Sequence, residues 1–210
     1  MCGIVGYIGK NNCKKTLIDG LKRIQNRGYD SVGISLLKNK KINTYKFAST
    51  HTNDSLSLLE NHVLNNDTDS CIGIGHTRWA THGSKCDLNA HPHTDKLNRI
   101  SIVHNGIIEN YLELKSKLIK ENYTFKTETD TEVIAILISK YFDECNSIEL
   151  SIQKCVSDLR GSWALCILFN ENPNSMWLTR NGSPLLLGVE NNYAMISSEN
   201  SGFNDQIKKY

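Results

Sequence analysis

The chain has 210 residues, of which 24 are Lys or Arg and 22 are Asp or Glu, so its formal net charge is only +2. Hydrophobic residues make up 39% and charged residues 22% of it, which excludes a disordered tail, a collagen-like repeat or a coiled coil as the main body. The balanced charge argues against a nucleic-acid partner, and the absence of an apolar run near 20 residues argues against a membrane span.

The first half of the chain predicts mainly strands, with two helices among them. Helical spacing of Leu17, Leu21 and Ile24 stops at Gly28, which suits the left-handed conformation after a helix end. The other predicted elements are a strand over 4–8, paired strands over 32–37 and 42–47, a helix over 56–63, and strands over 71–75 and 100–104. The segment 77–98 shows little periodicity, and an irregular loop of this length is more often functional than idle.

The second half predicts helices first and strands afterwards. The predicted elements are helices over 111–121, 131–142 and 148–159, then strands over 162–169, 176–179, 185–189 and 193–197. Helices thus cluster in the middle of the chain and strands at both ends. This segregation favours an α+β fold with helices packed on largely antiparallel sheets over a doubly wound parallel sheet.

The cysteines and the N-terminus indicate the compartment. Seven cysteines are spread along the chain without a Cys-x-x-Cys pair, which argues against a disulfide framework and a zinc ribbon. Cys71, Cys155 and Cys166 lie in apolar stretches and are predicted to be small core residues. The start of the chain lacks the layout of a signal peptide, so we expect a cytoplasmic protein.

Cys2 is the first candidate catalytic residue. Removal of Met1 would give Cys2 a free α-amine with a reference pKa of ~7.7–8.0 beside a thiol of ~8.5, so proton transfer between them costs only about 1 kcal/mol. One residue can then supply both base and nucleophile for acyl transfer from an amide through a thioester. The alternative is an incidental cysteine at a frayed terminus, although a strand beginning directly after it would hold it in place.

The pair Asn105-Gly106 is a candidate oxyanion site. An Asn side-chain N–H and the next backbone N–H can point at one oxygen, and glycine lets a substrate approach the backbone. The alternative is structural, because Asn-Gly after a strand is the commonest signal of a hairpin turn.

Arg78, Thr81 and His82 lie in a short segment directly after a predicted strand. Arg78 can hold a carboxylate through two charge-assisted hydrogen bonds, and the other two residues can donate to the same group. A surface salt bridge is the alternative for Arg78.

Asp130 is the candidate for holding a substrate ammonium group. Thr129 and Glu132 form a predicted capping box that opens a helix, and Asp130 is not needed by that cap. A carboxylate in the first helical turn is also favoured by the helix dipole, so both interpretations remain open.

Several histidines are candidate metal ligands, namely His76, His82, His91, His93 and His104. Their spacing does not match that of a known zinc motif, so we expect neither a metal nor a cofactor.

Taken together and in order, the motifs resemble those of a known enzyme family. The motifs are MCGIVGYIG at the start, RGYDSVGI from Arg27, GHTRWATHG from Gly75, NAHPH from Asn89, VHNGIIENY from Val103 and ETDTEVIA from Glu128. The sequence resembles the glutaminase domains of class II glutamine amidotransferases, within the N-terminal-nucleophile hydrolases, and among them those of the glutamine–fructose-6-phosphate aminotransferases. The sister domains of amidophosphoribosyltransferases and asparagine synthetases share the Cys-Gly-Ile start and an Asn-Gly pair. They do not share the residues of the motifs GHTRWATHG and NAHPH.

The resemblance implies a four-layer αββα sandwich and L-glutamine as substrate. It implies that Cys2 is the nucleophile with its own amine as base, and that Asn105 and Gly106 form the oxyanion hole. Arg27 falls where the family has an arginine beside the nucleophile, although a cation at a helix C-terminus is an equal explanation.

The resemblance also assigns the substrate contacts. Arg78, Thr81 and His82 match the positions that hold the glutamine α-carboxylate, and Asp130 matches the one that holds its α-amine. Trp79 matches the residue that gates an ammonia channel, although a buried aromatic at the base of a loop needs no such function.

The family's full enzyme converts fructose 6-phosphate to glucosamine 6-phosphate with the released ammonia, and we expect it to be a homo-oligomer. Its two sugar-isomerase domains have no counterpart in residues 1–210, so we expect one glutaminase domain, truncated at its C-terminal end, from a longer gene product. The alternatives are a glutaminase domain that serves another acceptor, a free-standing ammonia supplier, or a catalytically silent glutamine-binding domain.

Overall fold

Two antiparallel sheets lie face to face in this computed structural model, which describes residues 2–50, 54–66, 68–80 and 83–210. Within these residues the strand orders are β3-β2-β4-β1-β10-β9 in the larger sheet and β5-β6-β7-β8 in the smaller one. The strands are β1 Gly3–Gly9, β2 Ser31–Lys38, β3 Lys41–Ala48, β4 Ile72–Arg78, β5 His93–Thr94, β6 Ile100–Ile108, β7 Gly161–Phe169, β8 Trp177–Asn181, β9 Leu186–Glu190 and β10 Tyr193–Ser197.

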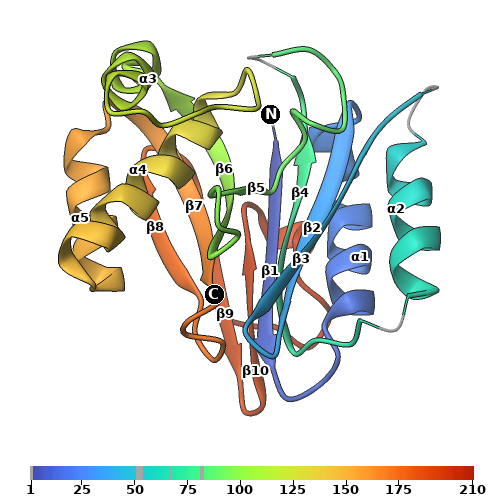
Figure 1. The fold of residues 1–210 in the computed structure, drawn as a ribbon. Helices are drawn as coiled ribbons and strands as arrows, with labels where there is room; N and C mark the ends of the chain where they lie inside the picture. Colours follow the sequence, from blue (N-terminus) through green and yellow to red (C-terminus); the bar gives the residue numbers. More distant parts are fainter. Residues whose placement is uncertain (1, 51–53, 67, 81–82) are drawn as a thin grey trace.

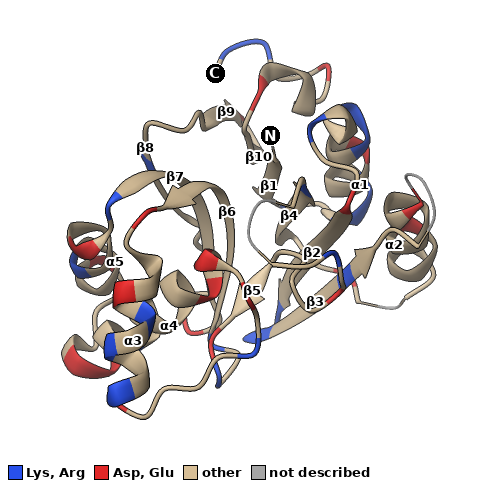
Figure 2. Cartoon of the chain, turned by 90° about the horizontal axis from the view of Figure 1, so that it is seen from above, with Lys and Arg blue, Asp and Glu red and all other residues tan. Residues whose placement is uncertain are grey.

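Helices cover the outer face of each sheet. The helices are α1 Lys14–Arg23, α2 Ser55–Leu64, α3 Tyr111–Lys120, α4 Asp130–Cys145 and α5 Ile148–Asp158, with short 3-10 helices at Gln25–Arg27 and Asn200–Gly202. Helices α1 and α2 pack on the larger sheet, whereas α4 packs on β5 and β6, with α3 and α5 against it. Figures 1 and 2 show the resulting αββα layers from the side and from above, and the predicted fold class is confirmed.

The period of two along each strand decides which side chains enter the space between the sheets. Ile74 of β4, Val103 of β6 and Ala164 of β7 belong to one fully buried apolar cluster in this space. Two positions further along β4 and β6, His76 and Asn105 are in hydrogen-bond contact across the same space. One end of the space between the sheets is therefore mainly apolar, with one buried hydroxyl pair, Ser35 and Ser101, and the other end is polar.

Strand β6 runs through the Asn105-Gly106 pair and stays paired with β7 as far as Ile108 opposite Gly161. The hairpin-turn interpretation of this pair is therefore wrong. Gly106 has a φ of +130°, and a Cβ atom there would lie 2.1 Å from the carbonyl oxygen of Ser162. Both the backbone conformation and the close approach of β7 require glycine at this position.

Other local predictions need correction. Gly28 has an extended φ of −173° rather than a left-handed one, because the 3-10 turn Gln25–Arg27 already ends the helix. A Cβ atom at Gly28 would lie 2.5 Å from the carbonyl carbon of Arg78, so the glycine serves a close approach instead. Cys71 is exposed, whereas the other two cysteines predicted in the core are buried. The short strand β5 lies inside the segment predicted to be irregular.

The predicted hairpin of β2 and β3 is confirmed. Lys38 pairs with Lys41, and the two residues between them, Asn39 and Lys40, have φ values of 50° and 59°. Positive φ at both central residues is the geometry of a two-residue type I′ turn, which matches the twist of the flanking strands.

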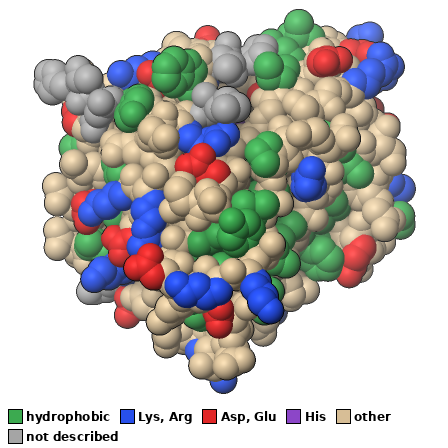
Figure 3. All heavy atoms as spheres, turned by 180° about the vertical axis from the view of Figure 1, so that it is seen from behind, with side chains coloured by type: hydrophobic (Ala, Val, Ile, Leu, Met, Phe, Trp, Pro, Cys, Tyr) green, Lys and Arg blue, Asp and Glu red, His purple; other side chains and the backbone are tan. Residues whose placement is uncertain are grey.

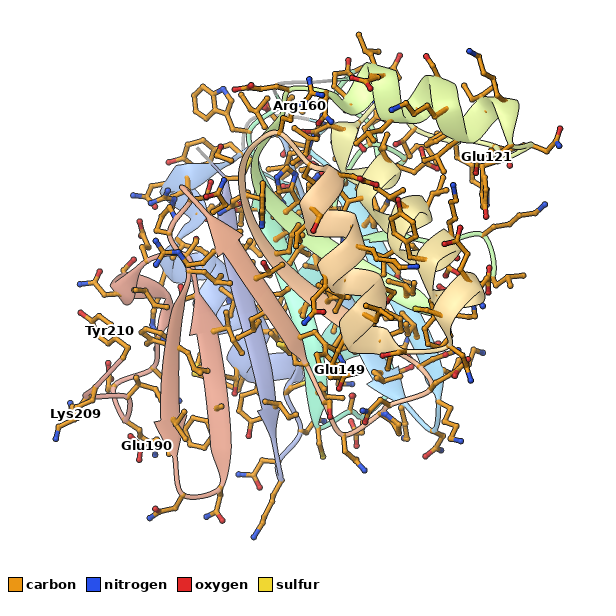
Figure 4. The ribbon with its side chains drawn as sticks, turned by 90° about the vertical axis from the view of Figure 1, so that its left-hand side faces the viewer. Glu121, Glu149, Arg160, Glu190, Lys209 and Tyr210 are labelled. Atoms are coloured by element: carbon orange, nitrogen blue, oxygen red, sulfur yellow. The ribbon has the colours of Figure 1, made fainter. Side chains whose placement is uncertain are left out.

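Charges of both signs are interspersed on the face seen from behind in Figure 3. Figure 4 shows Glu121 and Glu149 on the helical side of the molecule, opposite Glu190, Lys209 and Tyr210 near β9 and β10.

No helix among the described residues is long and apolar enough to cross a membrane.

Candidate active site

Cys2 lies directly before β1, and its position is fixed by contacts with three other parts of the chain. Its Sγ lies 3.3 Å from the backbone nitrogen of Trp79 and 3.5 Å from the carbonyl oxygen of the same residue. Its own carbonyl oxygen accepts hydrogen bonds from Nε of Arg27 at 3.1 Å and from Nδ2 of Asn105 at 2.9 Å. The interpretation of Cys2 as an incidental residue at a frayed terminus is not supported by this arrangement.

The thiol of Cys2 needs a base before it can attack a substrate. Burial raises its pKa above the ordinary value, although the Trp79 backbone and the charge of Arg78 act in the opposite direction. The thiol is therefore the resting form at neutral pH, and the thiolate must be produced during the reaction. The hydrogen bonds of Sγ given above go to backbone groups of Trp79, and neither of these can take up a proton.

Arg27 connects Cys2 to the segment that follows β10. Its Nε holds the Cys2 carbonyl, and its Nη1 lies 2.6 Å from the Glu199 carboxylate. Arg27 is placed by the 3-10 turn that follows α1, and Glu199 follows the strand that pairs with β1. This ion pair holds the two segments that flank the start of β1, so the predicted position of Arg27 beside Cys2 is observed.

The side-chain amide of Asn105 on β6 contacts Cys2 from the other sheet. Asn105 directs Nδ2 toward the Cys2 carbonyl, and its Oδ1 accepts from Nε2 of His76 at 3.0 Å. Gly106 follows Asn105 in β6 and also lines the pocket around Cys2. Asn105 and Gly106 therefore lie where they could bind an oxygen of a substrate attached to the Cys2 sulfur.

Asp130 is the first residue of α4, and its buried carboxylate reaches back to β6. Its Oδ2 accepts a hydrogen bond from the backbone nitrogen of Ile108 at 3.0 Å and lies 3.9 Å from Nδ1 of His104. Burial lowers the pKa of His104, and the charge of Asp130 acts against that shift. The Asp130 carboxylate thus lines one wall of the pocket, and its role as the partner of a substrate ammonium group stays a prediction.

One of the two hydrogen bonds of the predicted capping box is present, and the other is not. The side chain of Thr129 accepts from the backbone nitrogen of Glu132, as an N-cap should. The Glu132 carboxylate does not return to Thr129 but accepts from the backbone nitrogens of Lys126 and Thr127 at 2.8 and 2.7 Å. It therefore ties down the segment before the helix instead of the N-cap residue.

Arg78 is buried at the end of β4 rather than exposed in a surface salt bridge. Its guanidinium donates to the carbonyl oxygens of Gly83 and Ser84 at 3.3 and 3.4 Å. The Glu128 carboxylate holds the same segment by accepting from the backbone nitrogen of Ser84 and from Nδ2 of Asn89. Glu128, in the segment before α4, therefore holds the backbone of Ser84 in place, and the carbonyl oxygens of Gly83 and Ser84 in turn hold the guanidinium of Arg78.

The remaining predicted residues have different outcomes. Thr81 and His82 lie outside the described residues. Trp79 is 51% exposed, so the alternative interpretation as a buried aromatic is wrong, and its backbone contributes to the site through the contacts with Cys2.

Residues predicted separately converge on one small pocket. Its lining consists of Cys2, Arg78, Trp79, His91, His104, Gly106, Thr129, Asp130 and Thr131. A thiol, a guanidinium and a carboxylate thus face one small space from β1, β4 and α4. Such a set fits a substrate that carries a carboxylate, an ammonium group and an electrophilic carbon.

Comparison with known proteins decides the family. Residues 76–205, more than half of the chain, match the family described as a glutamine amidotransferase domain. The chain belongs to this family. Among solved structures, the glutamine phosphoribosylpyrophosphate amidotransferase of B. subtilis matches 96% of this amidotransferase domain with a TM-score of 0.77 at 25% identity, over 42% of its own chain. Another, described as the allosteric regulatory enzyme of purine biosynthesis, has a TM-score of 0.78 over the same shares.

Curated relatives are more similar in sequence. The domain is 47% identical to the glutamine–fructose-6-phosphate aminotransferase (isomerizing) of Clostridium acetobutylicum over 199 residues, which are 95% of this chain and 32% of that protein. It is 44% identical over 202 residues to the protein of the same name from Bacteroides thetaiotaomicron, with the same shares. The chain spans about a third of the length of these relatives.

The amidotransferase domain contains a group of buried histidines that the sequence indicated only as a possible metal site. The rings of His76 and His91 stack at 4.1 Å, and His93 meets His91 edge to face at 4.7 Å. No group of three or more metal-ligating side chains that could hold a metal ion occurs among the described residues. The signal that could have placed His76 is strand alternation, since it follows Ile72 and Ile74 on one face of β4.

A larger cavity of about 660 Å³ does not include Cys2, and its lining includes Lys46, His93 and Glu132. Burial lowers the pKa of Lys46 to about 8. Its ammonium donates to the carbonyl oxygen of Leu88 at 2.8 Å. This cavity is the larger of the two, but Cys2, Arg78 and Asp130 line the smaller pocket, which is therefore the candidate active site.

Proposed function

We propose that the chain hydrolyses L-glutamine to glutamate and ammonia through a thioester on Cys2. The observation that carries the proposal is the position of Cys2, which lines one pocket with Arg78 and Asp130 and whose backbone carbonyl oxygen accepts a hydrogen bond from the Asn105 amide. Membership of the glutamine amidotransferase domain family supports the substrate class.

The first step follows from the protonation state of the thiol. Since burial keeps the Cys2 thiol protonated, its proton must pass to a base, and removal of Met1 would supply the α-amine of Cys2 for this purpose. The sulfur then attacks the side-chain amide carbon of glutamine. The carbonyl π electrons move to oxygen, and a tetrahedral intermediate with a negative oxygen forms.

The intermediate is stabilised by the donors on β6 and then collapses. Nδ2 of Asn105 and the backbone N–H of Gly106 would donate to the oxyanion, an interaction typically worth about 2.7–4 kcal/mol per donor. The ammonium of Cys2 returns its proton to the departing nitrogen, the C–N bond breaks, and ammonia leaves. Water then attacks the thioester, releases glutamate and restores the thiol.

The two charges at the pocket would hold the amino-acid end of the substrate. The Arg78 guanidinium, fixed from Gly83 and Ser84, would bind the α-carboxylate with help from Thr81 and His82. The Asp130 carboxylate would bind the α-ammonium group. Neither interaction changes during attack at the distant amide carbon, so both are expected to affect KM more than kcat.

We further propose that the ammonia serves the conversion of fructose 6-phosphate to glucosamine 6-phosphate in a longer protein. Identity of 47% with an aminotransferase of that name, against 25% with the phosphoribosylpyrophosphate enzyme, supports this acceptor over a phosphoribosyl group. Assembly into a homo-oligomer and a cytoplasmic location stay predictions, as does the role of Trp79 at an ammonia channel.

The test is glutamine hydrolysis by the wild-type chain and by Cys2→Ala. We expect turnover to disappear in Cys2→Ala while the circular dichroism spectrum and melting temperature stay close to those of the wild type. Cys71→Ala is a matched control, because this exposed cysteine lies outside the pocket. Retained hydrolysis in Cys2→Ala would contradict the proposal.

An intact-mass measurement tests the base. The mature wild type should lack Met1 and gain one adduct from an electrophilic glutamine analogue, and this adduct should be absent from Cys2→Ala. A chain that keeps Met1 and still hydrolyses glutamine at the full rate would rule out the α-amine as base.

A further inference from the structure

His76 contacts the side chain of Asn105 from behind, on the side away from Cys2. Its Nε2 lies 3.0 Å from Oδ1 of Asn105 and 3.0 Å from the carbonyl oxygen of His104. The ring is fully buried, and it stacks on the ring of His91 at 4.1 Å with an interplanar angle of 21°. In β4 the His76 backbone is paired on both sides, with Ile4 and with Gly33. The ring is therefore fixed in plane and in position.

The acceptors around His76 determine where its proton is. A backbone carbonyl oxygen cannot donate, so Nε2 must carry the hydrogen that contacts the His104 oxygen. Nδ1 is buried without a hydrogen-bond partner among the described residues. Burial also lowers the pKa of His76 to about 3, so the ring is neutral at pH 7. The ring is thus a neutral imidazole with its single N–H directed at β6.

This N–H determines how the Asn105 amide is turned. An amide oxygen facing Nε2–H gives a hydrogen bond, whereas an amide NH₂ group in that place would set donor against donor. With Oδ1 held at the rear, Nδ2 faces Cys2, where one of its hydrogens is used by the Cys2 carbonyl at 2.9 Å. The second hydrogen of Nδ2 is then available for an oxygen of the substrate.

We propose that His76 is a positioning residue that keeps the NH₂ group of Asn105 turned toward the oxyanion, without touching the substrate itself. This inference rests on the proposed role of Asn105 in glutamine hydrolysis. Strand β4 would then contribute to transition-state binding only through the contact of His76 with Asn105 of β6.

The test compares substitutions at His76 in two backgrounds. In the wild-type background, His76→Leu removes the N–H, and we expect kcat to fall by about tenfold to a hundredfold, somewhat less than the loss of an oxyanion donor itself. KM for glutamine should stay within about twofold, because the oxyanion exists only in the transition state. His76→Gln can place an amide N–H near the position of Nε2 and should recover most of the lost rate.

In an Asn105→Ala background there is no amide to turn. His76→Leu should then lower kcat by less than about twofold, because residues that act through one another are not additive. His93→Leu is the matched control, since His93 belongs to the same buried group but bonds to Thr129. Its effect should be the same factor in both backgrounds.

The outcomes separate this inference from the proposed function. Equal losses from His76→Leu in both backgrounds, or a loss confined to KM, would overturn the positioning role and leave the function intact. Full activity of Asn105→Ala would overturn the oxyanion role and this inference with it. If His76→Leu fails to fold by circular dichroism, His76→Gln and His76→Asn replace it. The Asn side chain is too short to reach β6, so His76→Gln must be the faster of the two.

Discussion

The space between the two sheets has a mainly apolar end, where Ser35 and Ser101 form one buried hydroxyl pair, and a polar end, built from the same strands. At the apolar end, Ile74, Val103 and Leu168 pack without polar groups of their own. At the polar end, His76 and Asn105 occupy the next inward positions of β4 and β6 and contact each other through one hydrogen bond. The backbone pairing is continuous through both ends.

The same strands therefore carry two kinds of interaction, apolar packing at one end and directional hydrogen bonds at the other. Apolar packing is non-directional, so the apolar end supplies stability and tolerates side chains of similar volume. A buried hydrogen bond is directional, and a lost partner leaves the other group unsatisfied at a cost of about 1–3 kcal/mol. We therefore expect substitutions at the apolar end to change stability, and those at the polar end to change protonation and catalysis.

The largest expected effect is acid destabilisation by the buried histidines. Burial lowers the pKa of His76 to about 3 and those of His91 and His93 well below the ordinary value. The unfolded chain, with pKa values near 6.5, therefore binds more protons below that pH, and stability falls as the pH falls. Well below pH 6.5, each group lowers the free energy of unfolding by about 1.4 kcal/mol per pH unit, so the three together contribute about 4 kcal/mol per pH unit. His104, whose pKa burial also lowers, acts in the same direction.

Urea unfolding at pH 7, 6 and 5 measures this slope. His93→Gln removes one of these groups and should reduce the slope by about 1.4 kcal/mol per pH unit. An unfolding free energy that is the same at pH 7 and pH 5 would show that these rings are charged in the folded protein.

At the apolar end, Leu168→Ala should lower the free energy of unfolding by about 2–5 kcal/mol, because the fully buried side chain leaves a cavity. The rate of glutamine hydrolysis per folded molecule should stay within about twofold of the wild type. Leu168→Met nearly conserves the volume and is the control, with an expected loss below about 1.5 kcal/mol. A large change in kcat in Leu168→Ala would remove the distinction between the two ends.

At the polar end, Asp130→Asn should raise KM for glutamine by about tenfold to a hundredfold. The reason is the loss of a charged hydrogen bond, typically worth about 1.5–3 kcal/mol, to the substrate ammonium group. The amide remains able to accept from Ile108, so the fold should be preserved. Asp158→Asn, which changes a carboxylate outside the pocket, is the control. An unchanged KM in Asp130→Asn would exclude Asp130 from substrate binding.

The sequence predicted the order of the elements well but not their ends at the site. Asn105-Gly106 carries the local signal of a hairpin turn, yet pairing with β7 continues the strand through it. Gly28 carries the signal of a helix cap, yet the backbone of Arg78 makes glycine necessary there. In both cases a partner distant in sequence overrides the local preference.

The candidate residues were predicted individually, and their convergence was expected only from the family resemblance. Cys2, Asn105 and Asp130 belong to types and motifs that point to their chemistry. The role of His76 could not be predicted in the same way, because it depends on the two oxygens of β6 that face its ring.

By itself the sequence determined the alternation of inward and outward side chains, the helical faces, and the residue types able to perform the chemistry. These depend on local geometry, which each strand and helix carries within its own residues. Only the tertiary structure decided that β4 and β6 face each other, that the Asn105 amide meets an imidazole N–H, and that the Cys2 thiol is buried. Hydrogen-bond direction and burial depend on atoms from distant segments, so they exist only once the two sheets have packed together.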